Sequence, residues 1–461
     1  KFSSETTKAY TDDKLLTPEA LGAMRHNYLH IHDKDYYPTK SLTCVQHPLD
    51  KILKNGFQAR HGESRPAKRI ETASVLGCIS METAQNEMHG GQSIPAFDFY
   101  MAPYVEKSYH KHFQNISELF AEAGAENTRA AKIPMLAWQA TVDETNQAME
   151  GLIHNLNTLH SRAGAQVPFS SLNYGTDTSR YGRLVIQSLL LATEKGLGRG
   201  ETPIFPVQIF KVKEGVNYNE GDPNYDLFQY AMYVSGKRLF PNFSFIDSSF
   251  NKQYYKEGDP MTEVAYMGCR TRVVADCNGE DVVGGRGNLS FTSINLVKCA
   301  LESDKNETKF IENVEKCMEL AKTQLLHRYD IQCKRHVYNY PFLMGNGVWK
   351  GSEELSQTDT VEDILKHGTL SIGFIGLAEA MKYMYGEHHG ESDKVWRKAY
   401  LLIERMREVC DDWTKSEQLN FTLLATPAEG LSGTFTRKDK ARYGEIEGVT
   451  DKSYYTNSFH I

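Results

Sequence analysis

The chain contains 461 residues, of which 40% are hydrophobic and 24% charged, which is the ordinary balance of a globular protein. Its net charge of −7 argues against a nucleic-acid groove as the main function, because phosphate contacts need a basic surface, although a local basic pocket for a nucleotide is compatible with it. No apolar run approaches membrane-spanning length, and no signal peptide is visible.

The eight cysteines are dispersed, and none belongs to a CxxC pair. This pattern indicates a reduced, cytoplasmic protein and gives no support for a structural zinc site. The first residue is lysine rather than methionine, so we expect the natural N-terminus to lie outside the chain. No Ser/Pro/Gly-rich linker divides the sequence, and we therefore treat residues 1–461 as a single domain.

The first polar cluster along the chain is formed by His26, His30, His32 and Asp33. Metal ligation is one interpretation, since His30 and His32 would share one face of a strand. No separate fourth ligand is apparent, so hydrogen bonding in a substrate pocket or in the structure is the favoured interpretation.

Two cysteines in the first hundred residues differ in their surroundings. Cys44 lies among polar and turn residues in Ser-Leu-Thr-Cys-Val-Gln-His-Pro, which makes it a candidate functional thiol, whereas Cys78 lies in an apolar helical segment and is interpreted as a core residue. An unreactive buried cysteine is the alternative for Cys44 as well.

A short charged loop at residues 61–69 precedes a long helical segment that ends at Gly90-Gly91. Mixed charge of this kind usually marks a solvated surface. A nucleotide is the other interpretation, with Lys68 and Arg69 binding phosphate and Glu63 binding sugar hydroxyls.

Strands and helices alternate through the rest of the chain. Strands are predicted at residues 203–212, 240–246 and 289–296, and helices at 309–330, 360–368 and 395–413. Thr360 and Asp363 resemble a capping box for the second of these helices. Cys317 and Cys410 lie on apolar helical stripes and are predicted core residues. The mixture favours an α/β barrel or a large α/β sheet, and periodicity does not choose between them.

The most informative segment is Tyr-Met-Gly-Cys-Arg-Thr-Arg at residues 266–272. Cys269 stands in a polar loop without a CxxC partner or a nearby histidine, which suggests one-electron chemistry through a thiyl radical. The glycines of residues 284–287 do not open a convincing helix, so a dinucleotide fingerprint is weak, and a tight loop that carries Asn288 toward a site is the better interpretation.

Small hydroxyl residues follow His367-Gly368 and are interpreted as the start of a helix at Thr369-Leu370-Ser371. Backbone N–H groups at a helix start suit a phosphate. A simple Ser/Thr N-cap is the alternative.

Several long motifs together resemble the anaerobic (class III) ribonucleoside-triphosphate reductases, the glycyl-radical enzymes that make deoxynucleotides. Besides the Cys269 and Asn288 segments, they are His-Ile-His-Asp-Lys-Asp from residue 30, Ser-Leu-Thr-Cys-Val-Gln-His-Pro from 41, His-Gly-Gly-Gln-Ser-Ile-Pro from 89, His-Asn-Leu-Asn-Thr from 154 and Ser-Arg-Ala-Gly-Ala-Gln-Val-Pro-Phe-Ser-Ser from 161. The resemblance runs from about His26 to the end of the chain.

The resemblance implies a ten-stranded α/β barrel of two antiparallel five-stranded halves with a central finger loop. Cys269 matches the family's thiyl residue, which takes the 3′ hydrogen of the ribose, and Cys44 matches the reducing cysteine on the opposite side of the ring. Asn288 and Met267 match the subgroup that uses formate as co-substrate and reductant. A neutral asparagine can hold formate by hydrogen bonding without repelling it.

The resemblance also implies ligands and partners. Ser170, Ser171 and the Thr369–Ser371 segment, with His30, would face the ribonucleoside triphosphate, while Glu63, Lys68 and Arg69 would help to bind a dNTP effector at the interface of a homodimer. A radical-SAM activating enzyme would be a further partner; nucleic acid and membrane are not expected.

The chain departs from the family pattern at both ends. The family's radical glycine and its four-cysteine zinc site, both in a C-terminal segment, have no counterpart here, nor has the N-terminal cone that binds ATP or dATP in many members. We therefore expect a longer protein, with no metal held by this chain. A formate acetyltransferase would need adjacent cysteines, and a glycyl-radical dehydratase or a cobalamin-dependent reductase would need a glutamate where Thr271 stands; a non-catalytic nucleotide-binding module is the remaining alternative.

Overall fold

The computed structural model describes residues 2–59, 62–122, 130–161, 166–268 and 271–458. One of its two main sheets has the strand order β2-β5-β6-β7-β8, and all neighbours are parallel. Its strands are β2 (Val45–Gln46), β5 (Gln92–Ile94), β6 (Ser170–Tyr174), β7 (Val207–Val212) and β8 (Asn242–Phe245). The strands predicted at 203–212 and 240–246 are thus confirmed in shortened form.

The second sheet has the order β1-β11-β12-β13, with β1 antiparallel to β11 and the other pairs parallel. Its strands are β1 (Leu29–Ile31), β11 (Asn288–Asn295), β12 (Thr369–Ile375) and β13 (Asn420–Ala425). Strand β11 confirms the strand predicted at 289–296, except that Leu296 already begins a helix.

Two short antiparallel hairpins complete the strands. One pairs β3 (Phe57–Ala59) with β4 (Gly62–Ser64), and the other pairs β9 (Tyr266–Met267) with β10 (Thr271–Arg272). We call the β9–β10 hairpin the finger. Its tip residues Cys269 and Arg270 lie outside the described residues.

The two main sheets meet along one backbone seam, where residues 44–46 run beside residues 285–288. Cys44 N donates to Asn288 O at 3.0 Å and Asn288 N donates to Cys44 O at 3.1 Å. Gln46 N donates to Arg286 O at 2.7 Å, and Gly285 N donates to Gln46 O at 2.8 Å. Among the described residues no backbone hydrogen bond joins β8 to β13, so hydrogen bonding does not close the two sheets into a barrel.

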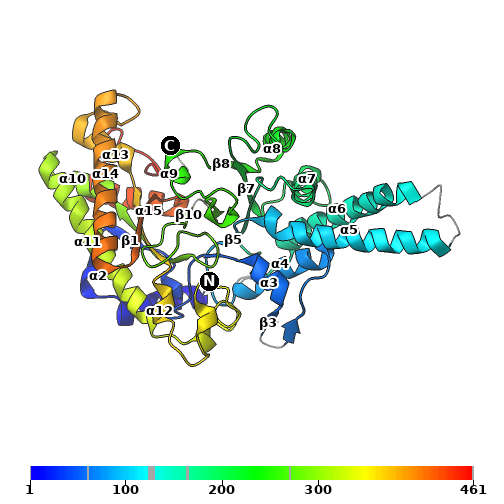
Figure 1. The fold of residues 1–461 in the computed structure, drawn as a ribbon. Coiled ribbons are helices and arrows are strands. Elements are labelled where there is room, and N and C mark those ends of the chain that lie inside the picture. The colour runs from blue at the N-terminus through cyan, green and yellow to red at the C-terminus, as the bar shows by residue number, and fades with distance from the viewer. Residues whose placement is uncertain (1, 60–61, 123–129, 162–165, 269–270, 459–461) are drawn as a thin grey trace.

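Helices lie against each sheet (Figure 1). Those on the side of the five-stranded sheet are α3 (Leu49–Asn55), α4 (Ile70–Ala84), α5 (Phe97–Glu122), α6 (Ile133–Thr158), α7 (Arg180–Lys195) and α8 (Tyr225–Arg238), with the short α9 (Ser249–Lys252) near the finger. Those on the side of the four-stranded sheet are α1 (Phe2–Tyr10), α2 (Pro18–Arg25), α10 (Leu296–Leu301), α11 (Glu307–Cys333), α12 (Glu362–Leu365), α13 (Leu377–Tyr385), α14 (Asp393–Glu417) and α15 (Glu429–Tyr443).

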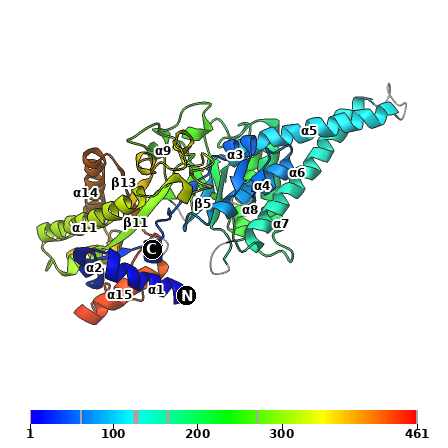
Figure 2. The same ribbon diagram turned by 90° about the horizontal axis from the view of Figure 1, so that it is seen from below.

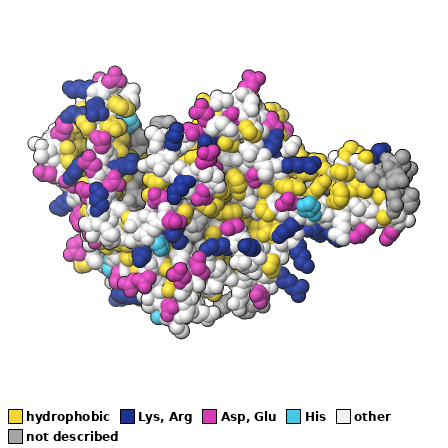
Figure 3. All heavy atoms as spheres, viewed as in Figure 1, with side chains coloured by type: hydrophobic (Ala, Val, Ile, Leu, Met, Phe, Trp, Pro, Cys, Tyr) yellow, Lys and Arg dark blue, Asp and Glu magenta, His cyan; other side chains and the backbone are white. Residues whose placement is uncertain are grey.

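The outer ends of α5 and α6 project from the body as an arm, which is visible from two directions (Figures 1 and 2). Apolar side chains gather along this arm (Figure 3), where Phe113, Leu119, Met135 and Leu136 are exposed. No helix of the described ranges is long and apolar enough to cross a membrane.

The amphipathic helices predicted at 309–330 and 395–413 are confirmed as α11 and α14, each slightly longer than predicted. Their apolar stripes are buried, and Cys317 and Cys410 are core residues, as is Cys78 in α4. The helical segment before Gly90-Gly91 ends earlier than predicted, at Ala84.

Two helix predictions were wrong. The helix predicted at 360–368 is only the four-residue α12 without a side-chain cap, because the backbone of Thr360 pairs with His336 instead. The helix start predicted at Thr369 is the beginning of β12, a strand buried between two parallel neighbours, and the next helix, α13, begins only at Leu377. Buried parallel strands lack the polar alternation that would identify them in a sequence.

Arg286 anchors the segment that leads from the finger back to β11. Its side chain is fully buried. The guanidinium donates to four carbonyl oxygens, those of His367 at 2.8 Å, Ala275 at 2.7 Å, Val282 at 3.3 Å and Val274. A loop that crosses the interior needs such partners, since an unpaired buried carbonyl is costly.

The charge of Arg286 is balanced by the buried carboxylate of Asp276, 3.8 Å away. Asp276 also contacts His367 Nδ1 at 2.8 Å and accepts from Lys350 at 3.0 Å and Asn420 at 3.2 Å. Burial alone would raise the pKa of Asp276, but the hydrogen bond to His367 and the charge of Arg286 hold that pKa well below its usual range. The network therefore fixes residues 274–286 against both β12 and β13.

Replacing Arg286 by methionine should lower the free energy of unfolding by roughly 3–5 kcal/mol, because it removes a buried positive charge beside Asp276 and leaves several buried carbonyls unpaired. Urea denaturation of the purified chain measures this. Arg407→Met is the matched control, because Arg407 is exposed and meets only Asp411 at 3.6 Å, so its loss should cost about 0–1 kcal/mol. Equal losses in the two variants would contradict the anchoring role of Arg286.

Candidate active site

A cavity of about 400 Å³ lies where the seam, the finger and the four-stranded sheet meet. Of the residues predicted from the sequence, its wall contains His30, Cys44, Met267, Asn288 and Ser371. These come from segments as distant as residues 30 and 371, so only the fold brings them together.

The seam sets the positions of Cys44 and Asn288 in this wall. Their backbones exchange both hydrogen bonds, so neither residue can shift without the other. Gly287 makes this approach feasible, because a Cβ there would lie 1.7 Å from Cys44 O. The predicted tight turn is present at residues 284–285, and the chain after it brings Asn288 into the wall of this cavity.

The side chain of Asn288 is buried and held at its amide nitrogen. Nδ2 donates to Thr369 Oγ1 at 3.0 Å, to Thr369 O at 3.2 Å and to Ser371 Oγ at 2.5 Å. Among the described residues, Asn288 Oδ1 has no hydrogen-bond partner. The side chain therefore offers an acceptor, which suits a hydroxyl group, whereas binding a carboxylate would require the amide to turn.

The finger enters the cavity between the two sheets. Asn173 of β6 pairs with the backbone of Tyr266 in both directions, at 2.8 and 3.0 Å, and Gly268 N donates to Ser171 Oγ at 3.0 Å. Met267 is fully buried. Cys269 lies outside the described residues, but Gly268 and Thr271 on its two sides both line the cavity.

The remaining predicted substrate residues do not line the cavity. Ser171 holds the finger, and Ser170 lies on the opposite face of β6. Thr369 accepts from Asn288, while Leu370 points away from Thr369 and is buried in the core. Ser171 and Thr369 thus hold residues of the cavity wall from behind.

His30 of β1 and His32, which follows that strand, stand together at the edge of the cavity. The rings of His30 and His32 are 4.9 Å apart and nearly perpendicular, and His32 Nε2 lies 2.8 Å from Ser293 Oγ. Burial lowers the pKa of His30 to about 4 and that of His32 well below its ordinary value, so both rings are neutral near pH 7. In the parts of the chain that the structure describes, no group of three or more His, Cys, Asp or Glu side chains is arranged to hold a metal ion.

A helix start that the sequence analysis missed lies in the same wall. Thr426, Pro427, Ala428 and Gly430 line the cavity where α15 begins. The N-cap Ala428 makes no side-chain cap hydrogen bond, and N–H groups at the start of a helix suit an anion. The helix start in the cavity wall is therefore that of α15 and not the one predicted at Thr369. The Thr-Pro pair just before α15 was the sequence signal that could have indicated it.

The predicted effector residues lie apart from the cavity. Glu63 is exposed in β4, and Lys68 is exposed just before α4. Arg69 lies 3.5 Å from Glu71 and 3.7 Å from Glu144 of α6, at the base of the projecting arm.

The sequence matches one protein family over its whole length. The family model, described as "Anaerobic ribonucleoside-triphosphate reductase", covers residues 1–461. The enzyme of that name from Escherichia coli is 32% identical over 463 residues, which are 98% of this chain and 62% of the relative. The enzyme of bacteriophage T4 is also 32% identical and is matched over 94% of this chain and 69% of its own length. The chain thus spans 62% of the length of the E. coli relative.

Solved structures agree with this fold. The anaerobic ribonucleotide reductase from Thermotoga maritima with citrate in its active site superimposes with a TM-score of 0.68 at 16% identity, over 98% of this chain and 78% of that one. The T. maritima enzyme in complex with dATP and CTP gives the same TM-score, over 99% of this chain and 72% of that one. The chain has the α/β fold of these reductases, and from the full-length sequence match it belongs to the anaerobic ribonucleoside-triphosphate reductase family.

Proposed function

We propose that this chain is the catalytic part of an enzyme that reduces ribonucleoside triphosphates to deoxyribonucleoside triphosphates by a thiyl-radical mechanism without oxygen. The observation that carries the proposal is the single cavity that contains Cys44, Asn288, Met267 and both flanks of Cys269. The two flanks, Gly268 and Thr271, belong to the finger, whereas Cys44 belongs to the seam between the sheets.

In this proposal the Cys269 thiyl takes the 3′ hydrogen atom of the ribose, and Cys44 donates a hydrogen atom from the other side of the ring. The radical would be supplied by a glycine on a C-terminal segment outside this chain, next to the expected zinc site. The chain's own contribution is to bring Cys44 and both flanks of Cys269 to one cavity, so that the two thiols would act on the same bound ribose.

The wall of the cavity also fits the polar parts of a nucleotide. The unpaired Oδ1 of Asn288 suits a sugar hydroxyl, and the start of α15 suits the phosphates. His30 and Ser371 line the same space, while Ser170, Ser171, Thr369 and Leu370 act behind it.

Formate is the proposed co-substrate. The finger has Thr271 where related sites carry a glutamate, so the sequence has no carboxylate two residues after the radical cysteine. Formate would supply both that carboxylate and the two electrons. Asn288, after its amide turns, would donate to it without repelling it.

The wider assembly is proposed from the family resemblance. It comprises a ten-stranded barrel, a homodimer in which the apolar arm is a candidate contact, a dNTP effector bound near Glu63, Lys68 and Arg69, a radical-SAM activating enzyme, and a cytoplasmic location. An ATP-binding cone would belong to a segment before this chain. In the T. maritima reductase, dATP is bound in a specificity site, which supports a comparable effector here.

The test is anaerobic turnover by the full-length gene product after activation by its radical-SAM partner, with NTP and dNTP present. We expect dNTP to form only when formate is added. Turnover that requires a dithiol or a redox protein instead would support the reductase function but exclude formate as the reductant. A protein with a verified glycyl radical that makes no dNTP would contradict the reductase itself.

Replacing Asn288 by glutamate should lower formate-driven kcat roughly 10²-fold, because a further carboxylate would stand in a cavity that already contains Asp33 and must admit formate, and the donors to Thr369 and Ser371 would be lost. Steady-state kinetics of activated enzyme measure this. The matched control, Asn219→Glu in an exposed loop, should keep full activity. Full formate-driven turnover by the Asn288 variant would exclude the proposed role.

Removing both effector cations in a Lys68→Ala/Arg69→Ala variant should weaken dATP binding about tenfold or more, since each charge-assisted contact contributes on the order of 1.5–3 kcal/mol. Calorimetric titration of the full-length protein measures the affinity. Lys252→Ala, which removes an exposed lysine of α9, is the control and should bind dATP normally. Unchanged affinity in the double variant would move the effector site elsewhere.

A further inference from the structure

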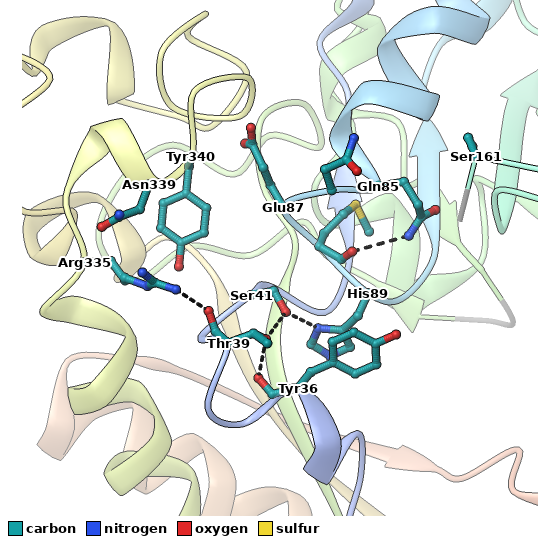
Figure 4. A pocket seen from close by; sticks show the side chains of 12 residues that line it. Tyr36, Thr39, Ser41, Gln85, Glu87, His89, Ser161, Arg335, Asn339 and Tyr340 are labelled. Atoms are coloured by element: carbon teal, nitrogen blue, oxygen red, sulfur yellow. Dashed lines mark hydrogen bonds between the residues drawn. The ribbon is translucent and has the colours of Figure 1, made fainter. Parts of the chain in front are cut away.

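A second cavity of about 370 Å³ lies behind the reaction cavity and has a polar wall (Figure 4). Tyr36, Ser41, Glu87 and Arg335 are among its lining residues. No step of the proposed reaction uses it.

His89 is common to both cavities. The residue lies in the wall of the reaction cavity together with Cys44 and in the wall of the second cavity together with Ser41. The side chain itself is fully buried. The ring of Tyr36 stacks on it at a centroid distance of 4.5 Å and an angle of 10°, which fixes its plane. The imidazole is therefore a partition between the two spaces.

A chain of hydrogen-bonding groups runs through this partition. From the second cavity, Thr39 Oγ1 lies 3.1 Å from Ser41 Oγ, which lies 2.9 Å from His89 Nδ1. On the reaction side, His89 Nε2 lies 3.4 Å from Thr43 Oγ1 and 3.6 Å from Asp33 Oδ2. Thr43 precedes Cys44, and Asp33 lines the reaction cavity.

The outer end of this chain reaches solvent, because Thr39 is exposed. The Thr39 hydroxyl also donates to Tyr36 O at 2.8 Å. Rotation about the Cβ–Oγ1 bond therefore switches the hydroxyl hydrogen between that carbonyl and Ser41 Oγ. Hydroxyl and imidazole groups each both donate and accept, which is the requirement for passing a proton along a fixed chain.

The proposed reaction needs such a proton. Formate becomes CO₂ by losing its C–H hydrogen as a proton together with two electrons. In the same reaction the C2′–O bond of the ribonucleotide breaks and a C2′–H bond forms. The balanced equation is NTP + HCOO⁻ + H⁺ → dNTP + CO₂ + H₂O. One proton is therefore consumed in each turnover, and the hydroxide leaving C2′ must be protonated.

We propose that His89 relays this proton from the second cavity to the reaction cavity, through Thr39 and Ser41 on one side and toward Asp33 and Thr43 on the other. The proposal rests on the reductase function proposed above. Tyr36 and Asp33 are the titratable groups packed against His89, and Glu87 and Arg335 are the further charged groups on the wall of the second cavity. His89 is thereby a proton-transfer residue, and Ser41 is a positioning residue that acts through it.

The test uses the full-length enzyme, activated to the same glycyl-radical content in every variant and assayed with saturating NTP, effector and formate in H₂O and D₂O. Ser41→Ala should lower kcat about tenfold with little change in KM, and His89→Gln should lower it roughly 10²-fold. The solvent isotope effect on kcat should rise in Ser41→Ala, because proton delivery becomes rate-limiting. Ser41→Thr keeps a hydroxyl and should restore both kcat and the isotope effect.

Tyr340→Phe is the matched control, because it removes a hydroxyl that lines the second cavity but donates to Lys40 O, outside the relay. It should leave kcat within about twofold. Loss of activity in Ser41→Ala without a rise in the isotope effect, or without rescue by Ser41→Thr, would overturn the relay and indicate a structural role. Full kcat in both His89→Gln and Ser41→Ala would overturn it as well, while absence of dNTP from the unaltered enzyme would overturn the reductase proposal first.

Discussion

The reciprocal backbone hydrogen bonds between Cys44 and Asn288 are the interaction on which the site depends. They are part of the seam that joins the two main sheets, and they place a thiol from one sheet and an amide from the other in one wall. The main chain makes both bonds, so they do not depend on the side chains of Cys44 and Asn288. Gly287 is required at the same point, since a side chain would collide with Cys44 O. The seam thus both joins the two sheets and positions two residues of the candidate site.

The finger passes through the interior and makes few regular backbone hydrogen bonds of its own. Buried polar side chains supply the missing hydrogen bonds. They are Asn173 and Ser171 near the tip, and Arg286 with Asp276 at the base. Such networks are stabilising only when every member is paired. The result is a rigid support for the proposed radical cysteine, as a reaction that depends on the distance between atoms requires.

The two cavities divide two kinds of transfer. In the proposed mechanism hydrogen atoms move within the reaction cavity, between sulfur and the sugar. Protons would come from the second cavity, across the buried ring of His89. This separation would give the proton that the reaction consumes a fixed route of its own.

Local pattern was enough to predict the amphipathic helices α11 and α14, the strand at Asn288–Asn295 and the core cysteines, because each depends on residues near in sequence. The long motifs were enough to identify the family. Pattern failed at β12, whose residues became a strand only because β11 and β13 bury both of its faces. It also missed the start of α15 at the cavity, the support given by Ser171 to the finger, and the place of His89 between two cavities. Each of these depends on contacts between distant segments, such as Ser171 and Gly268, which are 97 residues apart, and periodicity and spacing do not encode such contacts. The sequence by itself determined the family and the residue types of the site, and the tertiary structure alone decided which of those residues face one another.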